Sequence, residues 1–178
     1  MNRLFNYTVL FATLFLSSMS FSQVVHGVCK LTNVAVNELT CFGAAELNNV
    51  TIKGALSVFG TLSMIKTAVN GSIDVKGSFS STNSVVKGPV ITYGPISATT
   101  TVFNSNIISY TTDIVLNASE VKGSLSIESK DKIPTLQLID HTIVTGNVTF
   151  SKQAGIIKLD PGSQVLGSVT NGTKQNGQ

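Results

Sequence analysis

A short pattern recurs seven times along this chain, and its regular spacing constrains the fold more than any other feature of the sequence. In the first copy an apolar residue, Ile52, is followed by glycine two positions later and then by alternating apolar residues. Fixed-period self-similarity is the signature of a repeat architecture, in which each unit packs mainly on its neighbours. The first four copies start at a constant interval, and the seven copies begin at Ile52, Val69, Val86, Phe103, Val121, Val144 and Val165.

The alternation within one copy predicts a β-strand with one buried face, so that Ile52, Leu56 and Val58 would point inward. Three sides of about five residues each, joined at glycine corners, account for the observed period of about 17 residues. We therefore predict an all-β, single-domain parallel β-helix, or β-solenoid, of about eight coils of about 17 residues stacked at about 4.8 Å. A second set of corner glycines keeps the same period, at Gly43, Gly60, Gly77 and Gly94.

The later coils are less regular. The interval from Phe103 to Val121 is longer than the earlier ones, and still longer intervals follow it. We expect the extra residues to loop out at 129–134 and 152–162, which are rich in turn-forming and charged residues. The predicted solenoid covers residues 35–170. An N-terminal cap is expected at 23–34 and a disordered polar tail at 171–178.

Residues 1–22 have the features of a secretory signal peptide. Arg3 is followed by a short apolar run at 9–16, and the small-x-small site Ser20-Phe21-Ser22 would leave Gln23 as the new N-terminus. An uncleaved membrane anchor is the alternative. No other segment is apolar enough to span a membrane. We therefore expect a secreted or periplasmic protein, with the cell surface as one place where it could act.

Charge and cysteine content argue against nucleic acid and metal ions as partners. Removal of residues 1–22 would take away the only arginine, Arg3, and leave eleven lysines against nine acidic residues. A nucleic-acid-binding protein would instead concentrate Lys and Arg on one face. Cys29 and Cys41 could form a disulfide worth about 2–3 kcal/mol in an exported protein, or could remain as two buried thiols. Two cysteines alone make a poor metal site, and we expect neither metal nor cofactor.

One outward row of side chains stands out because most of its members are aromatic. Its members follow the predicted inward position before each corner glycine, so they should face solvent. Stacked rings can grip the flat face of a sugar, can mediate self-association, or can simply stabilise one another along the rod. The aromatic members are the candidate ligand-binding residues, and the full row is Phe42, Phe59, Lys76, Tyr93 and Tyr110.

No catalytic constellation is evident in the sequence. His26 and His141 are too far apart in the repeat to assume contact, and the pair Asp140-His141 is expected to lie on a surface insertion. Polysaccharide-cleaving β-helices need clustered carboxylates. The aspartates here are scattered over different coils, so we predict that the protein is not an enzyme. They are Asp74, Asp113, Asp131, Asp140 and Asp160.

The string Val-x-Gly-x-Ile/Val-x-Val-x-Gly-x-Phe/Ile, clearest from Ile52 to Ala98, resembles the repeat of bactofilins, the polymer-forming cytoskeletal proteins. The resemblance implies a β-helical core and subunits that polymerise end to end without nucleotide. Bactofilins are cytoplasmic, whereas this chain has a predicted export signal, two cysteines and irregular later coils.

Together these features predict a secreted, non-enzymatic β-solenoid. Its expected role is structural, self-assembling or surface-interacting, through its end coils. The alternative is a carbohydrate-binding or adhesin module that uses the aromatic row to bind a glycan or cell-surface partner.

Overall fold

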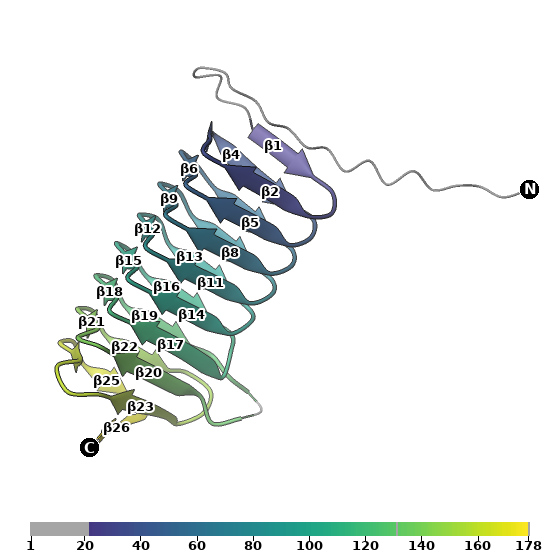
Figure 1. Ribbon diagram of the computed structural model, residues 1–178. Coiled ribbons are helices and arrows are strands. Elements are labelled where there is room, and N and C mark those ends of the chain that lie inside the picture. The colour runs from purple at the N-terminus through teal and green to yellow at the C-terminus, as the bar shows by residue number, and fades with distance from the viewer. Residues whose placement is uncertain (1–21, 131, 178) are drawn as a thin grey trace, which may run out of the picture.

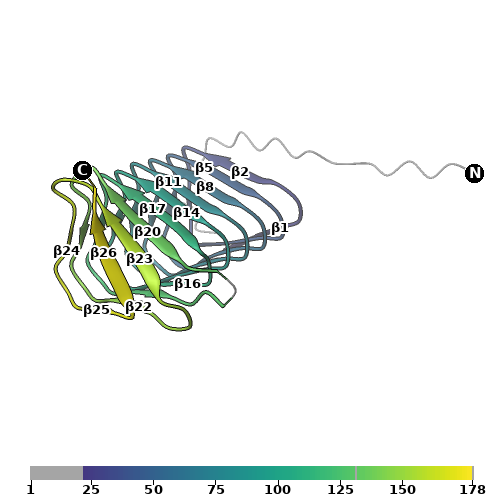
Figure 2. The same ribbon diagram turned by 90° about the horizontal axis from the view of Figure 1, so that it is seen from below.

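The computed structural model describes residues 22–130 and 132–177, and every regular element within them is a β-strand. The strands wind into a rod in which three parallel sheets enclose one core, with β1 and β2 at one end and β25 and β26 at the other (Figure 1). The view from below shows the three sheets as the sides of the rod (Figure 2). The predicted parallel β-solenoid is therefore confirmed.

Each coil contributes one strand to each sheet, in the order sheet A, sheet B, sheet C, except that the last described coil has no strand in sheet C. Sheet A consists of β1 (Ser22–Val25), β4 (Glu38–Cys41), β7 (Leu56–Val58), β10 (Ile73–Val75), β13 (Val90–Thr92), β16 (Ile107–Ser109), β19 (Leu125–Ile127), β22 (Val148–Phe150) and β25 (Val169–Thr170). Sheet B consists of β2 (Cys29–Thr32), β5 (Ala45–Asn48), β8 (Leu62–Ile65), β11 (Phe79–Thr82), β14 (Ile96–Thr99), β17 (Asp113–Asn117), β20 (Thr135–Ile139), β23 (Gly155–Leu159) and β26 (Gly172–Asn176). Sheet C consists of β3 (Ala35–Val36), β6 (Thr51–Ile52), β9 (Ala68–Val69), β12 (Val85–Val86), β15 (Val102–Phe103), β18 (Glu120–Val121), β21 (Ile143–Val144) and β24 (Gln164–Val165).

The register places equivalent residues of successive coils directly above one another. Val75 pairs with Val58 on one side and with Thr92 on the other, as the period of the sequence pattern requires. All three side chains are buried, so the alternating apolar positions of each strand form a continuous core along the rod. The largest buried side chains include Phe79 and Phe103, whose rings meet edge to face with centroids 6.2 Å apart.

Glycine is required where the backbones of neighbouring coils approach closely at a corner. A Cβ atom on Gly88 would lie 2.4 Å from the carbonyl carbon and oxygen of Gly71 in the coil beside it. Cβ atoms in proteins do not approach backbone atoms so closely. Neither of the two backbone segments can move apart here without disturbing the sheet to which it belongs. The recurring glycine of the sequence pattern is thus a consequence of coil stacking.

Both ends of the solenoid extend beyond the predicted bounds. The segment 23–34, predicted as a cap, instead carries β1 and β2, which pair with β4 and β5 and form most of a first coil. The segment 171–178, predicted as a disordered tail, instead contains β26, which pairs with all five residues of β23. Sheets A and B therefore have nine strands each, one more than the predicted eight coils would supply.

The irregular later coils keep the register of the sheets and place their extra residues at corners. The connection from Ile127 to Leu136 is longer than the equivalent connection from Thr92 to Ile96. The loop predicted at 129–134 accounts for this difference. The predicted loop at 152–162 is only partly correct, because β23 (Gly155–Leu159) occupies its middle and leaves extra residues on either side.

A column of buried hydroxyls runs along the corner between sheets B and C. Each hydroxyl residue of the column follows a residue with positive φ, for example Ser84 after Asn83 at 49° and Thr101 after Thr100 at 50°. The first two coils have Val34 and Val50 at this position instead. Ser119 Oγ accepts the N–H of Thr101 at 3.0 Å and donates to the carbonyl of Asn117 at 2.7 Å. Each hydroxyl thereby satisfies backbone groups that the turn removes from the sheets. The column contains Thr67, Ser84, Thr101, Ser119, Thr142 and Ser163.

Candidate functional site

The aromatic row lies along the corner between sheets A and B, which we call the A–B corner. The rings of Phe42 and Phe59 are stacked with centroids 4.8 Å apart and planes 16° apart, and those of Tyr93 and Tyr110 have the same geometry. All four side chains are exposed, at 46, 52, 46 and 41% respectively. The coil spacing of about 4.8 Å is itself close to the stacking distance of two rings, so a row of this kind stacks without adjustment.

His26 extends the row into the first coil, which the sequence analysis did not find. Its ring lies 4.8 Å from that of Phe42 with the planes 10° apart. The sequence does place His26 directly before a glycine, Gly27, just as Phe42 precedes Gly43. The interval from His26 to Phe42 is shorter than the regular period, which concealed the match. We call the six residues His26, Phe42, Phe59, Lys76, Tyr93 and Tyr110 the stacked column.

Lys76 fills the gap between the two aromatic pairs. Its Nζ lies 4.1 Å from the centroid of the Tyr93 ring and 3.0 Å from Oδ1 of Asp74. The hydrogen bond to the Asp74 carboxylate, with a further contribution from Tyr93, raises the pKa of Lys76 above its ordinary value of 10.5. Lys76 therefore stays protonated and continues the column as a cation on a ring face.

The stacking determines which parts of the rings remain available. Phe42 has His26 on one face and Phe59 on the other, while Tyr93 has Lys76 on one face and Tyr110 on the other. Stacking of a sugar on an aromatic side chain needs an unoccupied ring face. The exposed surface of these two rings is therefore mainly their edges, which suits packing against a broad partner surface better than stacking of one pyranose per ring.

A shallow hollow accompanies the first half of the stacked column. It has a volume of about 190 Å³ and lies between Phe42, Phe59 and Lys76 on one side and outward residues of sheet A on the other. The sheet A residues are Thr40, Ser57 and Asp74, so hydroxyl and carboxylate groups face apolar ring edges across the hollow.

The second half of the A–B corner carries the two larger insertions instead of aromatic residues. The loop between β19 and β20 and the loop between β22 and β23 contact each other, because Gln153 Nε2 donates to the carbonyl of Lys130 at 2.8 Å. Ile133 in the first loop is 60% exposed. One corner of the rod thus bears both the stacked column and the main departures from regular coil length.

The N-terminal end of the rod presents apolar side chains. Val25, Leu31 and Val34 occupy inward positions of the first coil, but they are only partly buried because the described residues include no coil beyond them. Each of the strands β1, β2 and β3 pairs with another described strand on one side only. This end therefore combines unpaired backbone edges with an incompletely covered core.

The C-terminal end of the rod is polar at the inward positions of sheet B, while Val169 in sheet A still packs against the core. Lys174 and Asn176 of β26 stack on Ile157 and Leu159, where earlier coils have apolar residues. The aliphatic part of Lys174 lies toward the core, and its Nζ donates to the carbonyl of Val165 at 3.3 Å. A charged residue at an inward position of the last strand is a known means by which proteins protect a sheet edge from further pairing.

Cys29 and Cys41 form a disulfide, with an S–S distance of 2.01 Å. Cys29 lies on β2 and Cys41 on β4, and both are buried. The bond therefore fastens the first coil to the second, at the end where the core is least covered.

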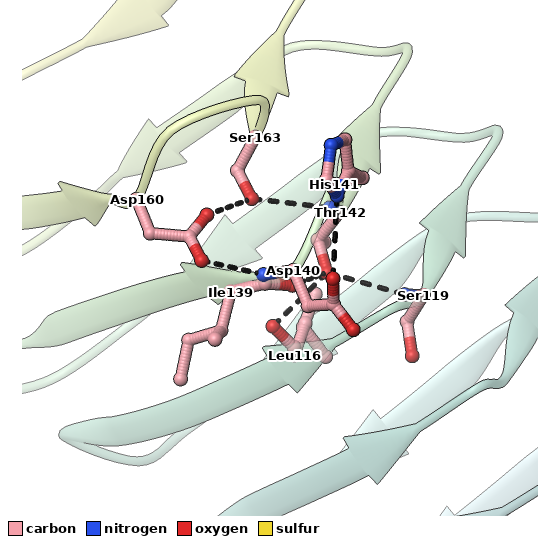
Figure 3. Close-up of polar contacts among 8 residues, drawn as sticks. All are labelled: Leu116, Ser119, Ile139, Asp140, His141, Thr142, Asp160 and Ser163. Atoms are coloured by element: carbon pink, nitrogen blue, oxygen red, sulfur yellow. Dashed lines mark hydrogen bonds and ion pairs between the residues drawn. The ribbon is translucent and has the colours of Figure 1, made fainter.

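The pair Asp140-His141 lies at the corner between sheets B and C, where two consecutive residues have positive φ and form an exposed turn (Figure 3). Asp160 of the neighbouring coil accepts the N–H of Asp140 at 2.7 Å and the hydroxyl of Ser163 at 2.6 Å. These two hydrogen bonds lower the pKa of Asp160 below its ordinary value of 3.8. Because Ser163 Oγ also accepts the N–H of Thr142, the hydroxyl is engaged in holding the turn.

The remaining titratable residues are dispersed along the rod. Asp74 is paired with Lys76, Asp113 accepts the hydroxyl of Thr112 at 2.7 Å, and His26 lies in the stacked column. Asp131 lies outside the described residues. Within residues 22–130 and 132–177, no three His, Cys, Asp or Glu side chains gather in a way that could hold a metal ion. The same residues include no helix long and apolar enough to cross a membrane.

Comparison with known proteins assigns this chain to no family. No protein-family model, no curated protein and no solved structure matches this chain.

Proposed function

We propose that this protein is an exported, non-enzymatic structural β-solenoid that works by associating with copies of itself. The observation that supports the proposal is the N-terminal end, where β1, β2 and β3 each pair on one side only among the described residues, next to partly exposed Val25, Leu31 and Val34. Unpaired strands above an apolar surface favour the addition of another strand. The bactofilin-like repeat, which implies end-to-end association, is consistent with the same role.

Export is part of this proposal. Signal-peptide cleavage after Ser22 would leave Gln23 as the first residue, within β1. The disulfide between Cys29 and Cys41 suits an oxidising compartment outside the cytoplasm. The protein would then act in the periplasm or outside the cell.

Light scattering coupled to size-exclusion chromatography, over a hundredfold range of protein concentration, tests self-association. We expect the weight-average mass to rise with concentration above that of a single chain. A mass that stays at one chain throughout would contradict the proposal. Intact-mass measurement on the same sample reports whether cleavage occurred after Ser22.

A second candidate function is binding of a glycan or another cell-surface partner at the A–B corner. The hollow beside Phe42 and Phe59 favours it, because hydroxyls and a carboxylate lie next to ring edges there. A glycan array probed with the wild type, the Phe42→Ala/Phe59→Ala variant and the Tyr93→Ala/Tyr110→Ala variant would separate the possibilities. Loss of a signal in the first variant alone assigns binding to the hollow, and absence of any wild-type signal rejects this candidate.

A further inference from the structure

The two ends of the rod differ in a way that determines how copies can meet. In the first coil the partly exposed inward positions hold Val25, Leu31 and Val34 together with one polar residue, Gln23. The one lysine of β2, Lys30, points outward and pairs with Glu46 at 2.9 Å. In the last coil, Lys174 has the inward position of sheet B that Cys29 has in the first coil, and Asn176 has the position of Leu31. The N-terminal end is therefore uncharged and mainly apolar over the core, whereas the C-terminal end carries a cation there.

We infer that the first coil is the association surface, that the second copy uses its own first coil, and that the C-terminal coil is a closed end. The resulting assembly is a two-fold dimer rather than a filament. This inference rests on the proposed self-association and specifies which surface it uses.

The charge on Lys174 argues against head-to-tail stacking. A head-to-tail contact that continued the register would stack Lys174 of one copy on Cys29 of the next and Asn176 on Leu31, and burying an unpaired charge over the core is costly. The outer side of β26 would gain a strand partner in this contact, but the Lys174 charge would be buried at the same time. Association of two N-terminal ends buries apolar side chains against apolar side chains and leaves Lys174 in water.

The backbone also permits an N-terminal to N-terminal contact. A two-fold axis perpendicular to the rod brings an edge strand of the first coil antiparallel to the same strand of the second copy. Such an isologous contact uses the surface on both copies and closes the assembly at two subunits, whereas a head-to-tail contact repeats without limit. The disulfide between Cys29 and Cys41 holds the first coil in place and so keeps this surface formed.

A matched pair of variants, one at each end, tests the inference. In the exported protein, Leu31→Lys adds a cation to the N-terminal end, and Lys174→Leu removes the cation from the C-terminal end. We expect the wild type to form dimers whose maximum dimension in small-angle X-ray scattering is roughly twice the rod length of about 40 Å set by strand spacing. Leu31→Lys should weaken dimerisation at least tenfold, and Lys174→Leu should leave the N-terminal contact intact.

Hydrogen exchange of the unmodified protein provides a measurement that does not depend on the folding of a variant. Amides of β1, β2 and β3 should become more protected as concentration rises, while those of β25 and β26 should not change. Filaments, side-by-side dimers of single-rod length, or protection at β26 would overturn the inference while leaving self-association in place. A monomer that retains residues 1–21 would show that the chain covers its own end and would also overturn it. A correctly processed monomer at every concentration would reject the proposed function itself.

Discussion

The buried hydroxyl column can be tested by removing one oxygen from the middle of the rod. Ser119 is 4% exposed, and its Oγ accepts the N–H of Thr101, which is fully buried. In Ser119→Ala this N–H loses its partner, and the full burial of Thr101 keeps solvent from replacing it. A buried unsatisfied amide costs about 1–3 kcal/mol, so we expect the free energy of unfolding to fall by about that amount.

The matched control is Ser119→Thr. Threonine occupies the same column at Thr67, Thr101 and Thr142, so the added methyl group has precedents at this corner and the oxygen is retained. A second control, Ser97→Ala, removes an exposed hydroxyl from the outer face of sheet B and should change stability by less than about 0.5 kcal/mol.

Urea unfolding followed by circular dichroism measures the difference. A loss of about 1–3 kcal/mol should lower the midpoint by roughly 1 M for an m-value of about 1–3 kcal/mol/M. Hydrogen exchange gives a residue-specific check, because the Thr101 amide should exchange faster in Ser119→Ala than in Ser119→Thr. If Ser119→Ala unfolds at the wild-type midpoint and the Thr101 amide stays protected, the Ser119 hydroxyl does not contribute to the stability of the rod.

Three further substitutions address other features of the rod. Ser109 is buried, and its hydroxyl has no hydrogen-bond partner among the described residues. Because Val75 has the equivalent position two coils away, Ser109→Val should stabilise the protein by about 1 kcal/mol in the same urea assay. A lower midpoint would contradict this. Gly88→Ala should destabilise by about 3 kcal/mol or more, because its Cβ would meet the backbone of Gly71, and a thermal melt unchanged from wild type would refute the close-packed corner. Asp160→Asn should lower the midpoint at neutral pH, and the gap to wild type should close as pH falls through the depressed folded-state pKa of Asp160, below 3.8; a gap that persists at lower pH would show that the carboxylate charge is not involved.

The regular part of the solenoid could be predicted from the sequence because one physical requirement fixes it. Coils that stack in register must repeat their apolar positions and corner glycines at one interval, and from Ile52 to Phe103 that interval does not change. The column Val58–Val75–Thr92 follows directly from this spacing.

The two ends were mispredicted for different reasons. The first coil is shorter than the next, since Cys29 pairs with Ala45 and Ala45 in turn pairs with Leu62, and the break in period concealed it. In the last coil β26 has no apolar side chain, so the composition of 171–178 resembles that of a disordered tail. β26 nevertheless pairs with β23, because backbone hydrogen bonds need no apolar side chain and the edge of β23 is already in place.

The buried hydroxyls were missed although they recur at the same constant interval as the glycines, at Thr67, Ser84 and Thr101. Serine and threonine after a turn residue ordinarily indicate an exposed loop. Their burial follows from the positive φ of the preceding residue, which turns a backbone N–H into the interior, and that geometry is visible only in the structure.

The extra residues of the irregular coils are concentrated at one corner of the rod. An insertion inside a strand would shift every following side chain to the wrong face, so a solenoid can accept extra residues only at its corners. The A–B corner carries the two larger insertions, whereas the corner between sheets C and A keeps its length from Val69 to Ile73 and from Val144 to Val148. The A–B corner also carries the stacked column, so the chain concentrates both its exposed rings and its variable loops on one line. This corner is therefore the part of the rod at which we propose that other partners bind, separate from the N-terminal end proposed to join two copies.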